Sequence, residues 1–108
     1  MEKFVPVITK QYSRKVNVKD IVYIQQQQRR LAIVTDDETF ICYERMDNIM
    51  ENLDDRFFRV MKKLTINLEK VVMAKDQRLF FENGTSVYLG KENFVKTKQK
   101  FAGYLRKL

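Results

Sequence analysis

Short apolar runs rich in β-branched and aromatic residues, separated by polar residues, occupy the first 45 positions, and this pattern is typical of β-strands. The segment from Arg14 to Val18 also alternates with the two-residue period of a strand. Pro6 places the first run at a sheet edge or at the start of a strand, because proline has no backbone N–H to donate to a ladder. Turns are expected where polar or acidic residues interrupt the runs. This order predicts a meander of antiparallel strands, with strands expected over residues 3–10, 14–18, 20–25, 31–35 and 39–43 and turns over 28–30 and 36–38.

The period changes after residue 45. Met46, Ile49, Met50 and Leu53 have the spacing i, i+3, i+4 and i+7, which places them on one face of a short helix. We interpret the two methionines as core residues and not as ligands of a metal. The sequence 52–55 ends this helix.

Short strands return after this helix, and a second helix closes the chain. Asn83-Gly84 is the strongest hairpin signal in the sequence. The apolar segment 57–60 and a basic cluster come first, and strands are then expected over residues 64–68, 71–74, 78–82 and 85–89. The helix is expected to begin at Lys91 and to bury an apolar face made of Phe94, Phe101, Leu105 and Leu108, flanked by Val95 and Tyr104.

The whole pattern predicts a mainly β fold with two helices. No linker, repeat or change of composition divides the chain, so we predict one domain over residues 1–108. No stretch approaches the roughly 20 apolar residues of a membrane span, and no secretory signal is apparent. Cys42 is the single cysteine and lies in an apolar run, which favours a buried thiol and a reducing, cytoplasmic location.

The composition excludes several classes of chemistry. The sequence has no histidine, which removes Ser-His-Asp and Cys-His catalysis, and with one cysteine a structural zinc site is not expected. The three glycines are isolated, so no glycine-rich phosphate loop is present. We therefore expect no enzyme activity, no cofactor, no metal and no small-molecule substrate.

The net charge of +7 favours a polyanionic partner and an ordinary basic surface equally. The placement of the charge says more. Paired basic residues occur at Arg29-Arg30 and at Lys62-Lys63, where turns are expected, with Arg59 close by. Basic turns on a β scaffold suit contacts with phosphates and base edges. The last helix carries +5 of the net +7, because six basic residues oppose the single acidic Glu92; they are Lys91, Lys96, Lys98, Lys100, Arg106 and Lys107.

Several of these segments, in this order and spacing, resemble the LytTR DNA-binding domain of bacterial response regulators. The most specific part is Phe57-Phe58-Arg59-Val60, followed by Asn67-Leu68, which resembles the family's Phe-Arg-Val-His-Arg-Ser run and its Val-Asn pair. The resemblance extends from about Asn17 to Leu108 and also rests on residues 20–24, 30–35, 55–60, 67–71 and 81–84.

This resemblance implies an elongated antiparallel β-sheet sandwich with two short helices. It implies a bacterial transcription regulator that binds double-stranded DNA by inserting loops into major grooves. Asn67 matches a family asparagine whose role is either DNA contact or structure. The resemblance assigns DNA contacts to Arg29, Arg30, Met61, Lys62, Lys63 and Lys91. Asn67, together with Arg59, Lys96 and Lys98, which are selected for their charge, is a candidate for contacts to the DNA backbone.

The sequence also departs from the family pattern. Met61 replaces the family histidine, Lys63 replaces a serine and Gln25 replaces an acidic residue. No receiver domain precedes the domain, so we expect either a stand-alone regulator or a part of a larger one, which acts as a homodimer on tandem sites.

Two alternatives stay open. The first is an interaction module that has lost sequence reading and binds another regulator or a membrane-bound inhibitor. The second is a basic last helix that lies on anionic lipid.

Overall fold

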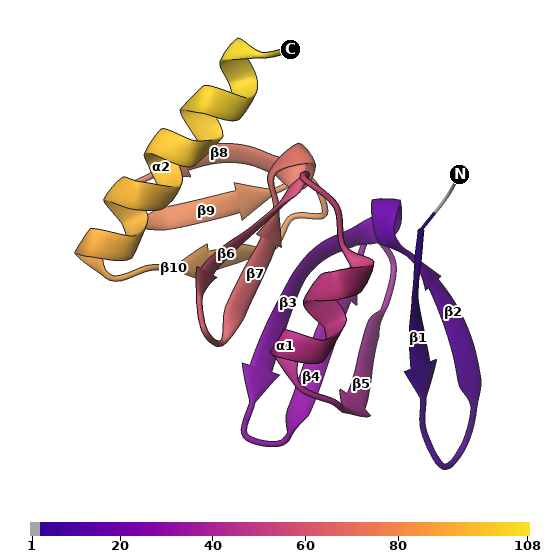
Figure 1. The fold of residues 1–108 in the computed structure, drawn as a ribbon. Coiled ribbons are helices and arrows are strands. Elements are labelled where there is room, and N and C mark those ends of the chain that lie inside the picture. Colours follow the sequence, from indigo (N-terminus) through magenta and orange to yellow (C-terminus); the bar gives the residue numbers. More distant parts are fainter. Residues whose placement is uncertain (1–2) are drawn as a thin grey trace. The chain divides into compact units, whose positions relative to one another are not determined.

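The computed structural model describes residues 3–108, and its contacts divide the chain into two compact units, one ending at Asn67 and one running from Leu68 to Leu108. The described chain is mainly β, every strand pairing is antiparallel, and it has two α-helices (Figure 1). The predicted fold class is therefore confirmed. No helix among residues 3–108 is long and apolar enough to cross a membrane.

The first unit holds a hairpin and a five-stranded sheet. Strands β1 (Phe4–Ile8) and β2 (Ser13–Asn17) form the hairpin, and Pro6 lies in β1, opposite Lys15 of β2. A 3-10 turn at Val18–Asp20 leads into the sheet. The sheet has the order β5-β4-β3-β7-β6, and its strands are β3 (Ile21–Gln27), β4 (Arg30–Thr35), β5 (Thr39–Tyr43), β6 (Phe57–Met61) and β7 (Leu64–Asn67).

A short helical segment connects β5 to β6. It consists of α1 (Met46–Ile49) and a 3-10 turn over Met50–Asn52. Met46, Ile49 and Leu53 are buried and Met50 packs against the core, which confirms the helix face predicted from spacing. The alternating residues of the strands supply the rest of this core, including Val5, Val7, Ile21, Ile24, Leu31, Ile33, Phe40 and Cys42.

The strand register brings two turns to one end of the sheet. Gln25 pairs with Leu64, so the end of β3 lies beside the start of β7. Arg30 pairs with Tyr43, so the start of β4 lies beside the end of β5. The β3–β4 turn, the β6–β7 turn and the segment that enters α1 consequently share one end of the sheet (Figure 1).

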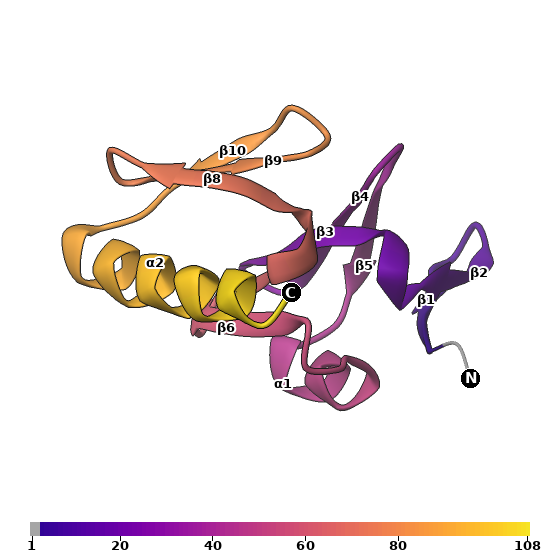
Figure 2. The ribbon, with the colours of Figure 1, turned by 90° about the horizontal axis from the view of Figure 1, so that it is seen from above.

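The second unit is a small sheet with a helix. After a 3-10 turn at Leu68–Lys70, the strands β8 (Val71–Lys75), β9 (Arg78–Phe81) and β10 (Ser86–Tyr88) form a sheet of order β10-β9-β8. Helix α2 (Lys91–Arg106) lies along this sheet (Figure 2). The predicted hairpin is present, and Gly84 has a φ of 88°, the left-handed conformation that glycine adopts without strain.

The buried face of α2 differs from the predicted one at its C-terminal end. Leu105 and Leu108 are 48% and 83% exposed, whereas Thr97 is fully buried and Phe101 is 7% exposed. A helix of 16 residues is about 24 Å long, and five-residue strands span only about 17 Å. Periodicity places Leu105 and Leu108 on the apolar stripe, but the sheet is too short to cover its end.

Candidate functional site

The two turns that carry paired basic residues lie next to each other in the first unit. The backbone N–H of Gln26, near the end of β3, donates to the carbonyl of Lys63 in the β6–β7 turn at 2.8 Å. Gln28, in the β3–β4 turn, has a φ of 59°, which turns the chain tightly and presents Arg29. Arg29, Lys62 and Lys63 are all exposed.

These turns line a hollow of about 570 Å³ in the first unit. The end of β5 and the start of α1 complete its wall. Five basic side chains and two acidic ones line it, which gives this part of the surface a positive potential. The charged lining residues are Arg29, Arg45, Arg59, Lys62, Lys63, Glu44 and Asp47.

Gln26 ties the β3–β4 turn to the start of α1. Its Nε2 lies within hydrogen-bond distance of three carbonyl oxygens, those of Gln28 at 3.1 Å, Arg30 at 3.2 Å and Glu44 at 3.1 Å. Its Oε1 accepts the backbone N–H of Met46 at 2.9 Å. The uncharged Gln26 side chain therefore connects the β3–β4 turn to the first residue of α1.

Arg59 ties the β6–β7 turn to the same helix. Its Nη1 donates to Oδ1 of Asp47 at 2.7 Å, and its Nη2 donates to the carbonyl of Lys62 at 2.9 Å. Its Nε is buried and has no hydrogen-bond partner among the described residues. The hydrogen bond and the charge of Arg59 lower the pKa of Asp47, so this carboxylate is ionised at neutral pH.

The other acidic residue of the hollow is also engaged. The Glu44 carboxylate accepts the backbone N–H of Arg45 and the side-chain amide of Asn48, both at 2.8 Å. These hydrogen bonds lower the pKa of Glu44. By contrast, no hydrogen bond or salt bridge within residues 3–108 uses the side chains of Arg29, Lys62 or Lys63. The side chain of Arg45 is likewise in no hydrogen bond or salt bridge within residues 3–108, so the unpaired positive charge of the hollow belongs to the two turns and to Arg45, just before α1.

The other candidates are distributed over both units. Arg30 is exposed at the first position of β4, and Met61 is 38% exposed at the end of β6. Asn67 is fully buried and its amide donates to the carbonyl of Ile21 at 2.8 Å. Its geometry favours the structural role over the DNA contact, a choice that the sequence left open. Lys91, Lys96 and Lys98 are exposed on α2 in the second unit.

Sequence reasoning missed the residues that hold the turns. Gln26 appears in the sequence only as one of four consecutive glutamines, and Asp47 as an acidic residue of an exposed helix face. Their roles arise from hydrogen bonds to residues 18 and 12 positions away. Periodicity carries no signal for such pairs.

Comparison with known proteins adds the family. Residues 12–102 match the LytTr DNA-binding domain family. No curated protein matches the sequence. Among solved structures, the chain is similar to a LytTr DNA-binding domain from Bacillus cereus, which is part of a protein described as a methyl-accepting/DNA response regulator. The TM-score is 0.69 at 17% identity, over 99% of this chain and 96% of that one, so this likeness concerns the fold. On the family match over residues 12–102, the chain belongs to the LytTR family of DNA-binding domains.

Proposed function

We propose that the protein is a bacterial transcription regulator that binds double-stranded DNA in a sequence-specific way, with the turns of the first unit entering a major groove. The observation that carries this proposal is the meeting of the Arg29 turn and the Lys62-Lys63 turn in one basic hollow. Arginine can donate two hydrogen bonds to guanine, and lysine supplies a point charge for phosphates.

Each candidate has a role in this proposal. Arg29 and Arg30 read base edges or phosphates from the β3–β4 turn. Lys62 and Lys63 contact phosphates, and Met61 adds an apolar contact where the family has histidine. On α2, Lys91 is a further contact, while Lys96 and Lys98 approach the DNA backbone. Arg59 and Asn67 are not retained as contacts, because their donors bind within the protein.

In vitro selection from random duplexes tests this proposal directly. We expect a defined motif, repeated if the protein binds tandem sites as a homodimer. Affinity should fall steeply with salt, by a slope of about 0.9 per neutralised phosphate on a log–log plot. The mass of the DNA complex gives the stoichiometry. A selection that returns no preferred sequence would contradict sequence-specific binding.

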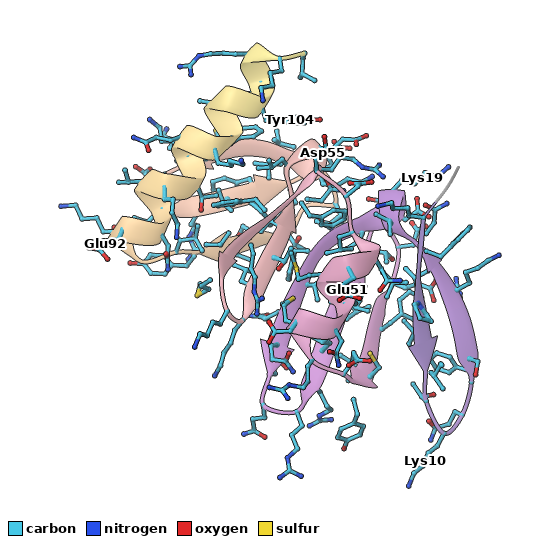
Figure 3. The ribbon with its side chains drawn as sticks, in the orientation of Figure 1. Lys10, Lys19, Glu51, Asp55, Glu92 and Tyr104 are labelled. Atoms are coloured by element: carbon cyan, nitrogen blue, oxygen red, sulfur yellow. The ribbon has the colours of Figure 1, made fainter. Side chains whose placement is uncertain are left out.

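Single variants test the residues. Arg29→Ala is expected to weaken binding to the selected site by about 1–3 kcal/mol if Arg29 contacts a base. Lys62→Ala should weaken all duplexes alike and reduce the salt slope by about 1. Lys19→Ala is the matched control, because it removes one positive charge just before the start of β3, at the end of the strand away from the hollow (Figure 3). Equal losses for Lys19→Ala and Lys62→Ala would argue against a localised contact.

The DNA-binding measurements also distinguish the proposed function from the alternative one, a module that binds another protein. Met61 is 38% exposed beside the basic turns, and methionine has the flexible apolar side chain that is frequent at protein-binding surfaces. Binding to a regulator or to a membrane-bound inhibitor, with only non-specific affinity for DNA, would assign the domain to protein interaction. The cytoplasmic location and the role as the effector part of a response regulator belong to the same proposal.

A further inference from the structure

The start of α1 makes a hydrogen-bonded connection to each of the two basic turns. The backbone N–H of Met46 donates to Gln26, whose amide bonds the carbonyls of Gln28 and Arg30 in and beside the β3–β4 turn. The carboxylate of Asp47 accepts from Arg59, which also holds the carbonyl of Lys62 in the β6–β7 turn. Two consecutive residues of one short helix thus fix both turns.

The geometry points to a positioning function for this helix. We propose that Gln26, Asp47 and Arg59 set the distance and orientation between the two basic turns, and that the sequence specificity of the domain depends on them although they do not contact DNA. This inference rests on the proposed function for its effect on DNA. Its effect on the turns themselves is independent of DNA.

Asp47 is an acidic residue in the wall of a basic hollow, so an electrostatic role and a positioning role predict opposite effects of its removal. A negative charge beside a DNA surface repels phosphates, so its removal should strengthen binding on electrostatic grounds alone. A positioning role predicts the opposite for the preferred site, because its removal releases Arg59 and the turn that Arg59 holds. The two explanations differ in the sign of the effect.

Arg59 supports the same assignment. Both of its terminal nitrogens donate within the protein, and its Nε is buried. The planar fork of arginine bonds Asp47 and Lys62 together, which the single ammonium of lysine does less well. Arg59→Lys keeps the positive charge and should still lose specificity, whereas a simple phosphate contact would survive this substitution.

The test measures the affinity ratio between the selected duplex and a scrambled duplex. Asp47→Ala is expected to reduce this ratio by about three- to tenfold, in the range of a lost charged hydrogen bond at a partly exposed site. Glu51→Gln is the control, because it removes one exposed negative charge from the same helical segment, four residues on (Figure 3). This control should leave the ratio unchanged and slightly raise non-specific affinity.

A double-mutant cycle shows whether Asp47 acts through the turn. This cycle measures the affinity for the selected duplex itself: in a Lys62→Ala background the further loss of this affinity from Asp47→Ala should be smaller, because the side chain that Asp47 helps to position is already gone. Fully additive effects would overturn the inference. Gln26→Met is the corresponding change for the other turn, with Gln25→Met, the neighbouring strand residue, as its control.

Trypsin supplies a readout without DNA. Cleavage after Lys62 or Lys63 should be several-fold faster in Asp47→Ala than in wild type and Glu51→Gln, because a released turn opens more often. Unchanged cleavage, or an Asp47→Ala variant that binds the selected duplex as tightly as Glu51→Gln, would overturn the inference. If wild type shows no preferred duplex, the proposed function fails, and the cleavage rates still decide the role of Asp47.

Discussion

Asn67 offers the most direct test of the distinction between structure and DNA contact. Its side chain is fully buried, and its Nδ2 donates to the carbonyl of Ile21 at 2.8 Å. The β3–β7 ladder ends at the pair of Tyr23 and Ile66, so the Asn67 amide continues the pairing of the two strands by one further hydrogen bond. Asn67→Ala removes this donor, so the buried carbonyl of Ile21 loses the hydrogen bond from the amide.

The expected loss follows from these contacts. An unpaired buried carbonyl costs about 1–3 kcal/mol, and the space left by the amide adds to this, so we expect a total near 2–4 kcal/mol. A loss of this size should lower Tm by roughly 10 °C or more in a chain of this length. Asn67→Asp should be worse still, because a carboxylate has no hydrogen to donate and would face the Ile21 carbonyl in the interior.

Urea unfolding followed by circular dichroism measures this loss, with an unchanged slope showing that only stability has changed. Gln99→Ala is the control, since Gln99 is an exposed amide side chain on α2 and should change stability by no more than about 0.5 kcal/mol. Folded Asn67→Ala should keep the DNA discrimination of wild type. An Asn67→Ala variant of normal stability that has lost this discrimination would refute the structural assignment.

Three further predictions concern other parts of the chain. Burial raises the pKa of the Cys42 thiol, so a thiol reagent at pH 8 should react slowly with folded protein and rapidly in urea. Hydrogen bonds from Arg56 lower the pKa of Asp54. The ionised Asp54 therefore stabilises the fold above its unfolded pKa, and this stabilisation is lost as the pH falls below about 4. The difference in urea midpoint between wild type and Asp54→Asn should shrink over that range and stay constant above about pH 5. Gly84→Ala should cost about 1–2 kcal/mol in a urea titration through backbone strain alone, because a Cβ there meets no neighbour.

The sequence predicts the local elements of this protein well. The β-branched, apolar run at residues 31–35 and the spacing of Met46, Ile49 and Leu53 identify a strand and a helix face because both depend on near neighbours. The basic turns at Arg29 and Lys62 are predictable for the same reason, since polar pairs between apolar runs mark turns.

Features that depend on distant contacts are not predictable in this way. The meeting of the two turns follows from the pairing of β3 with β7, and no local pattern records that pairing. The position of the Asp47–Arg59 hydrogen bond beside the β3–β4 turn depends on the same pairing of β3 with β7. The exposure of Leu105 depends on the length of the sheet beneath α2 and not on the helix itself.

The pairing of β3 with β7 also has a consequence for the order of folding. Ile24 and Thr65 face each other in this pairing, whereas β3–β4, β4–β5 and β6–β7 are hairpins of neighbouring strands. Closing a chain loop of this length costs more entropy than forming a hairpin, so the hairpins should form first and the β3–β7 pair should join them in a slower step. The hollow lies where β3 pairs with β7, and the two turns that line it belong to different hairpins. An intermediate with both hairpins intact would therefore still lack the surface, and DNA binding should appear only with the last kinetic phase of refolding.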